Sequence, residues 1–140
     1  MSIQAVLLPL FVQVALTFVL LFWMARLRVT AVTSGRVKAR DIALSPAGWP
    51  ERETQIGNAF HNQLQLPMLF FLLVALALIT RKADLLFVVL SWLFVLLRMG
   101  HVFEHVTANN VRRRFYWFAS AAVVLLVMWI VFAIQILLGL

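Results

Sequence analysis

The chain has 140 residues, of which 64% are hydrophobic and 12% are charged, whereas soluble domains are about 45–50% apolar and about 25% charged. A chain this short and apolar cannot cover its core with polar surface, which excludes a soluble globular domain and predicts an integral membrane protein with a single domain over residues 1–140. The formal charge is +7, but the basic residues cluster at the ends of apolar segments, where they meet lipid headgroups, so no nucleic-acid partner is expected. The absence of cysteine excludes disulfides, a protein thiolate nucleophile and a sulfur-ligated metal.

Four apolar segments predict four membrane-spanning helices, over about residues 5–28, 57–80, 84–106 and 115–138. The fold class is therefore an all-α integral membrane four-helix bundle. The first segment has no charge before Arg26 and carries Phe22 and Trp23 at the depth expected for an interfacial aromatic belt. No basic region or small-residue cleavage site precedes it, so we expect a retained helix rather than a signal peptide.

The second span is predicted to be longer than the bilayer is thick. The stretch Val29–Ile56 is the only long polar segment, and it ends in a cluster of turn residues closed by Pro50. Pro50 suits the first position of a helix, and the pattern then runs helical through Ile79, so the first part of this helix should project out of the bilayer or line a polar crevice. Pro67 deprives the carbonyl of Gln63 of its helical partner, which predicts a bend there.

The basic residues predict the orientation. Ten of the twelve lysines and arginines lie on one side of the predicted bundle, in the long loop, in the turn before Arg114 or at the span ends next to them. Only Arg81 and Lys82 lie on the other side. The positive-inside rule therefore places the long loop in the cytoplasm and both termini outside.

Two polar stripes lie on the second and third spans at the same, cytoplasmic, end. Arg98, His101 and His105 fall at i, i+3 and i+7 on one face of the third span, and Asn62 and Gln65 belong to a matching stripe on the second. Ionisable groups at membrane depth need partners and usually mark a pathway or a ligand site. The cluster at this depth is rich in donors and cations and poor in carboxylates: Arg26, Arg28, Asn58, His61, Asn62, Gln65, Arg98, His101, Glu104, His105 and Arg112 to Arg114. Because arginine suits carboxylate or phosphate groups, the cluster predicts a small, flexible, anionic ligand that enters from the cytoplasm beside an apolar co-substrate from the lipid.

Plainer interpretations apply to part of this set. Arginines at membrane ends are often headgroup anchors, and interior amides often join helices. We expect the first role for Arg28, Arg36, Lys38, Arg40, Arg112 and Arg113, and the second for Gln13 and Gln135. A non-catalytic membrane protein whose basic and histidine cluster binds anionic lipid, or stabilises an oligomer, is the alternative function.

Metal and haem sites are further alternatives. His101, Glu104 and His105 spell H-x-x-E-H, an inverted zincin motif. A zinc site of that type needs a third protein ligand, and no Asp, Glu or His follows His105, so no metal site is expected. A haem between His61 and a histidine of the third span is compatible with a four-helix membrane bundle but does not require the arginines.

The polar stripes resemble those of the membrane-associated proteins in eicosanoid and glutathione metabolism, the MAPEG family. The run Asn62-Gln63-Leu64-Gln65-Leu66-Pro67 resembles the second-helix N-x-x-E…P signature in its bacterial variant. Arg98-Met99-Gly100-His101, then His105, then Arg114 resemble the third-helix Arg, His and Tyr and the arginine that opens the fourth helix. Arg26-Leu27-Arg28 resembles the arginine pair that closes the first helix. Gln65 stands where the family usually has Glu, and His105 replaces a tyrosine.

The resemblance implies a function and an assembly. The protein would be a homotrimer in a bacterial inner membrane, with glutathione bound as co-substrate between subunits near the cytoplasmic face. It would act as a transferase or peroxidase on an apolar electrophile. Arg114 would be the catalytic residue, because its fixed positive charge would stabilise the glutathione thiolate. The residues that would bind glutathione are Arg26, His61, Asn62, Gln65, Arg98, His101 and His105.

Overall fold

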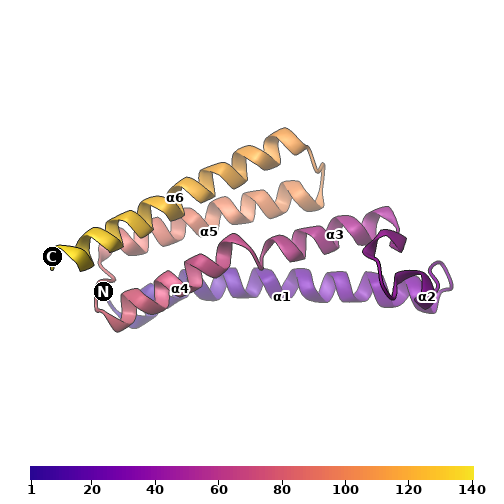
Figure 1. Cartoon of the computed structure of the whole chain (residues 1–140), viewed down its shortest axis with the longest axis horizontal. Helices are drawn as coiled ribbons and strands as arrows, with labels where there is room; N and C mark the ends of the chain where they lie inside the picture. Colours follow the sequence, from indigo (N-terminus) through magenta and orange to yellow (C-terminus); the bar gives the residue numbers. More distant parts are fainter.

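The computed structural model describes all residues 1–140, and it contains four long apolar helical segments that form a membrane helical bundle. The second segment is made of two consecutive helices, and a short helix and a 3-10 turn lie in the long loop (Figure 1). The elements are α1 (Ile3–Thr33), α2 (Ala39–Ile42), η1 (Pro46–Gly48), α3 (Glu51–Asn62), α4 (Leu66–Ile79), α5 (Leu85–Val106) and α6 (Val111–Leu137).

Each long segment is long and apolar enough to cross a membrane. α1 has 31 residues, about 46 Å at about 1.5 Å per residue, and the hydrocarbon core is about 30 Å thick, so α1 extends beyond the bilayer. Only 31 of the 140 residues are buried, and large hydrophobic side chains are exposed along all four segments. An apolar outer surface of this extent requires lipid as its solvent, so the protein is an integral membrane protein.

The core is apolar and lies where α4, α5 and α6 meet, with Val6 contributed by α1. The rings of Phe70 and Phe94 pack at 4.8 Å between centroids across the α4–α5 contact, and Leu73 and Val95 are fully buried beside them. This core joins the two helical hairpins seen in Figure 1, one made of α1 with α3 and α4, the other of α5 with α6. It therefore fixes the position of α5, which carries the polar stripe.

The second span is interrupted at the place where Pro67 predicts a bend. α3 ends at Asn62 and α4 begins at Leu66, and the three residues between them form tight turns in which the amides of Gln63, Leu64 and Gln65 donate to carbonyls three residues earlier. The missing amide of Pro67 removes one helical bond, and the turn lets the backbone leave the helix before it resumes. Pro50 also precedes the helix as its cap rather than opening it.

Two arginines expected to be headgroup anchors belong instead to the folded end of the bundle. Arg36 donates to the carboxylate of Glu53 at 2.6 Å, and the Glu53 side chain is 1% exposed. The guanidinium of Arg28 stacks on Trp49 at 4.8 Å from the ring centroid. A side chain at Gly57 would place its Cβ 2.9 Å from that guanidinium, so glycine leaves the room that Arg28 occupies. These contacts fix the long loop against α1 and α3.

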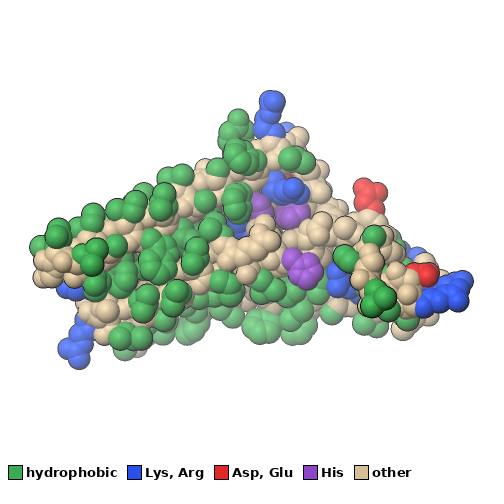
Figure 2. All heavy atoms as spheres, viewed as in Figure 1, with side chains coloured by type: hydrophobic (Ala, Val, Ile, Leu, Met, Phe, Trp, Pro, Cys, Tyr) green, Lys and Arg blue, Asp and Glu red, His purple; other side chains and the backbone are tan.

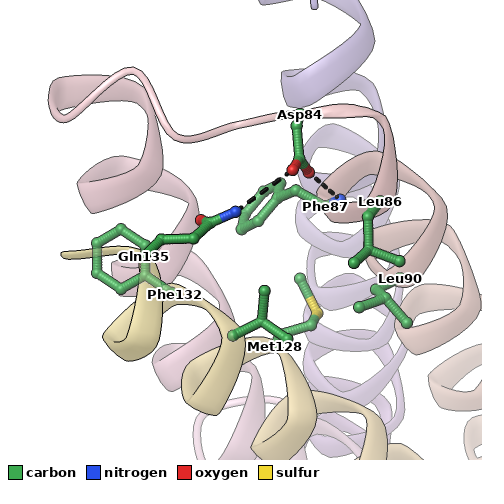
Figure 3. A pocket seen from close by; sticks show the side chains of 8 residues that line it. Asp84, Leu86, Phe87, Leu90, Met128, Phe132 and Gln135 are labelled. Carbon is green, nitrogen blue, oxygen red and sulfur yellow. Dashed lines mark hydrogen bonds between the residues drawn. The ribbon is translucent and has the colours of Figure 1, made fainter. Parts of the chain in front are cut away.

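The opposite end of the bundle carries both termini and a small, mostly apolar pocket (Figure 3). Asp84 caps α5 by accepting a hydrogen bond from the Phe87 amide at 2.8 Å, and its second oxygen accepts from Gln135 of α6 at 3.3 Å. The Lys82 ammonium donates to the backbone carbonyl of Leu140. Gln135 thus joins two helices, as expected for an interior amide.

Candidate functional site

The polar stripe of α5 faces the interior of the bundle. Arg98 is fully buried, and His101 and His105 are 2% and 5% exposed. The stripe is possible because residues at i, i+3 and i+7 share one helical face, and that face of α5 is covered by α1, α3 and α6. A cation and two imidazoles therefore lie inside a bundle whose other interior residues are mostly apolar.

Arg98 is held by the turn between α3 and α4. Its Nη2 donates to the Asn62 side-chain oxygen at 2.5 Å and approaches the Asn62 carbonyl at 3.4 Å and the Gln63 side-chain oxygen at 3.3 Å. Its Nε and Nη1 have no partner, and neither of the chain's ion pairs involves it. A buried cation without a carboxylate leaves positive potential at this depth of the bundle. Arg98 does not line the hollow that Asn62 lines, so its charge would act on a bound ligand from behind Asn62 rather than by direct contact.

An open hollow of about 290 Å³ lies in front of Asn62, between the α3–α4 turn and the first turns of α6. It is lined by Asn62, Gln65, His101, Val111, Arg114, Phe115 and Phe118. Basic and histidine side chains gather on this face near the start of α6 and the end of α3, whereas hydrophobic side chains cover most of the rest (Figure 2). The Asn62 amide donates to the Gln65 side-chain oxygen at 3.3 Å. No acidic residue lines the hollow, so it suits an anionic, hydrogen-bonding ligand.

Arg114 is half-buried at the edge of this hollow, and the turn before α6 sets its position. Its Nη1 donates to the side-chain oxygen of Asn109 at 2.5 Å. Asn109 has a φ of 51°, a left-handed conformation that asparagine tolerates better than most residues. Asn110 caps α6 by accepting from the Arg113 amide at 3.1 Å, and the Glu104 carboxylate accepts from the Asn110 amide at 3.1 Å. The other donors of the Arg114 guanidinium are free to meet a ligand.

The two histidines of α5 pack against each other and against α6. Their rings meet edge to face at 5.6 Å between centroids, and the His101 ring lies 6.1 Å from that of Phe118. The Nδ1 atom of each is buried without a partner. Although His101, Glu104 and His105 are close in sequence, no group of three histidine, aspartate or glutamate side chains is placed to hold a metal ion.

The structure brings together four of the sequence-predicted site residues and leaves others apart. Asn62, Gln65, His101 and Arg114 line one hollow, with Arg98 and His105 buried next to it. His61 is exposed on α3, with its ring against Phe60, and Arg26 is exposed on α1. Neither of these two lines the hollow within one chain.

Two residues that support the site did not stand out in the sequence. Gln63 is fully buried and contacts Arg98, although only its burial distinguishes it from the exposed Gln65. Asn109 holds Arg114, and the adjacent asparagines at 109 and 110 before a run of arginines are the only sequence signal for that turn.

The model of the MAPEG family matches residues 6–134, which is nearly the whole chain and includes every residue of the hollow. The chain belongs to the MAPEG family. No curated protein and no solved structure matches it. Members of this family are typically glutathione-dependent transferases or peroxidases of the membrane. MAPEG membership agrees with the four apolar helices.

Proposed function

We propose that this MAPEG protein is a glutathione-dependent membrane transferase or peroxidase that acts on apolar electrophiles. The observation that carries the proposal is the hollow itself. Arg114, His101 and two side-chain amides line it, a second arginine is buried behind it, and no carboxylate lines it.

The donor set fits glutathione, which carries two carboxylates, one ammonium and two peptide groups. The Asn62 side-chain amide offers donors to carboxylate or peptide oxygens. The Gln65 side-chain oxygen replaces the usual glutamate of the family as an acceptor for the ammonium, with a weaker attraction because it is uncharged. Arg98 adds positive potential behind Asn62. His101 and His105 complete the wall on the α5 side, with His105 in contact behind His101.

Arg114 is the residue that we assign to the chemistry. A thiol with a pKa of about 8.5 is only a few per cent ionised at neutral pH, and the thiolate is the nucleophile. The Arg114 guanidinium stays charged and does not take up the thiol proton, so it stabilises the thiolate while water accepts the proton. In a transferase reaction the thiolate sulfur forms a bond to carbon of the electrophile, and the leaving group departs with the electrons of the broken bond.

An apolar groove beside the hollow fits the second substrate. Leu66, Leu69, Ala122, Leu125, Leu126 and Trp129 line a groove of about 470 Å³. Its walls continue those of the hollow, because Leu69 is one turn after Gln65 on one side and Ala122 is one turn after Phe118 on the other. An electrophile dissolved in lipid could thus approach the sulfur position from within the bilayer, without passing through water.

The proposal includes a homotrimer with the site between subunits. The hollow is open on one side and, at about 290 Å³, is slightly smaller than most ligand sites, which measure about 300–1,000 Å³. A neighbouring subunit would close it and would explain why Arg26 and His61 face outward from one chain. We further propose that the protein resides in a bacterial inner membrane with both termini outside and the site toward the cytoplasm.

Thermal unfolding of the purified protein in detergent tests the function against its alternative. A ligand that binds only the folded state raises the unfolding temperature. Glutathione and S-hexylglutathione should both raise it, and S-hexylglutathione should raise it more because its chain reaches the apolar groove. If anionic phospholipid stabilises the protein while both glutathione compounds leave it unchanged, the lipid-binding alternative replaces this proposal.

A further inference from the structure

A chain of buried polar side chains runs from the hollow into the centre of the bundle. Gln13 of α1, Gln63 of the α3–α4 turn and Arg98 of α5 are each fully buried. The Gln63 side-chain oxygen accepts from Gln13 Nε2 at 3.0 Å and from Arg98 Nη2 at 3.3 Å. Gln63 Nε2 donates to the carbonyl of Ala59 at 3.0 Å. One amide thus connects three of the four long helical segments.

Gln63 is out of reach of a ligand in the hollow. Its oxygen accepts two hydrogen bonds, one amide hydrogen is donated, and the side chain is not exposed. Buried polar groups are costly unless they are bonded, so this arrangement strongly favours one conformation of the turn. The neighbouring residue, Asn62, is the one that reaches the hollow.

The same Arg98 nitrogen contacts both Gln63 and Asn62. Gln63 restrains the guanidinium from the core side, and the guanidinium in turn holds the Asn62 side-chain oxygen at 2.5 Å. With its oxygen held there, the Asn62 amide hydrogens are directed to Gln65 and the hollow. The interruption of the helix at residues 63–65 removes the regular backbone bonds that would otherwise fix these side chains, which makes the amide link more important.

We propose that Gln63, supported by Gln13, is a positioning residue that holds Arg98 and Asn62 in the orientation required for binding at the hollow. Arg98 likewise acts through Asn62. The consequence for glutathione rests on the proposed function, whereas the restraint of the turn does not. The proposal concerns binding of the co-substrate, because Arg114 is held separately by Asn109 on the other side of the hollow.

A spectroscopic experiment tests the restraint without any ligand. The chain has no cysteine, so Leu64→Cys, at an exposed position in the turn, gives a single site for a nitroxide label. The label should become more mobile in Gln63→Met and should stay as in the parent protein in Gln63→Glu, which keeps an oxygen to accept from Gln13 and Arg98 and loses only the hydrogen bond donated to Ala59. Gln135→Met, which removes an interhelical amide at the far end of the bundle, is the matched control and should leave the label unchanged. Equal mobility in Gln63→Met and the parent protein would overturn the proposal.

Steady-state kinetics tests the consequence for the reaction. Gln63→Met should raise KM for glutathione about tenfold, the effect of about 1.4 kcal/mol, and change kcat less than twofold. Gln63→Glu should restore KM to within about threefold of wild type. A loss confined to kcat, or the same loss in Gln63→Glu and Gln63→Met, would contradict a positioning role. If Gln63→Met does not fold, Gln13→Met removes only the hydrogen bond from Gln13 to Gln63 and should raise KM for glutathione by a smaller factor.

The two experiments separate the two proposals. If the label responds as expected but wild-type protein neither binds nor uses glutathione, the proposed function fails and the restraint of the turn stands. If glutathione is used and the label does not respond, the positioning role fails and the proposed function stands.

Discussion

Replacing Arg114 with alanine should lower the rate of glutathione conjugation about tenfold while leaving glutathione binding nearly unchanged. Two unit charges about 4 Å apart attract by about 1 kcal/mol in water and about 4 kcal/mol at a protein-surface dielectric of about 20. Because Arg114 is half-buried at the edge of an open hollow, we take about 2 kcal/mol for the attraction between its guanidinium and the bound thiolate. That energy lowers the pKa of the bound thiol by about 1.5 units, from about 8.5 to about 7.

The rate follows from the thiolate fraction. At pH 7 the thiolate is about 3% of an unperturbed thiol and about half of one with a pKa of about 7, a ratio of about fifteen. A thiolate of lower pKa is somewhat less nucleophilic, which reduces the expected loss to about tenfold. The loss should be largest below pH 7 and should vanish above about pH 9, where both proteins bind glutathione as thiolate.

The assay is the ultraviolet absorbance of the thiolate in glutathione bound to the protein, followed by conjugation of a chlorodinitrobenzene at saturating substrates. Arg113→Ala is the matched control, because Arg113 is adjacent, exposed and lines a different hollow with Tyr116 and Trp117. It removes the same charge and should keep the thiolate signal. Equal losses in Arg113→Ala and Arg114→Ala would refute the local charge effect, and so would wild-type activity in Arg114→Ala.

Three further predictions concern topology, assembly and stability. Reporter fusions at Arg40 and after Leu140 should give opposite readouts, cytoplasmic at Arg40, and a cytoplasmic signal from Leu140 would reverse the orientation. Native mass spectrometry from detergent should find a trimer, and monomer alone across a concentration series would contradict the shared site. Arg36→Met should lower the free energy of unfolding by about 1–2 kcal/mol because it leaves the buried Glu53 carboxylate without its partner. The Arg40 side chain is 77% exposed, so Arg40→Met should change the free energy of unfolding by less than about 0.5 kcal/mol. Equal effects of the two variants would refute the stabilising role of the Arg36–Glu53 ion pair.

The polar stripe could be predicted because it depends only on helical spacing. Arg98, His101 and His105 repeat at i, i+3 and i+7 in an otherwise apolar segment, so their common face follows from the period of an α-helix. The charge-poor segments likewise predict an all-α membrane bundle, which the structure and the family match confirm.

The interruption of the second span and the role of Gln63 could not be predicted in the same way. Pro67 removes one backbone bond whether the helix bends or stops, and the choice depends on what the freed residues contact. Here Gln63 reaches Gln13, 50 positions earlier in the chain, and Arg98, 35 positions later. The spacing of residues along one helix carries no information on contacts with residues of other helices that are far away in the sequence.

The roles of Arg28 and Arg36 depended on the loop. A basic residue after a span has the same sequence context whether it meets a headgroup or folds back. The difference lies in Trp49 and Glu53, which the long loop and α3 bring to them. Where the loop folds back could not be derived from its composition.

Isothermal titration of glutathione into the purified protein shows whether the hollow binds this co-substrate. We expect saturable binding to wild type, at least a tenfold weaker affinity for Asn62→Leu, and an unchanged affinity for Asn58→Leu, which removes an exposed asparagine one turn earlier on α3 and outside the hollow. A folded wild-type protein that binds no glutathione, or an Asn62→Leu variant that binds it as tightly as wild type, would contradict the proposed binding.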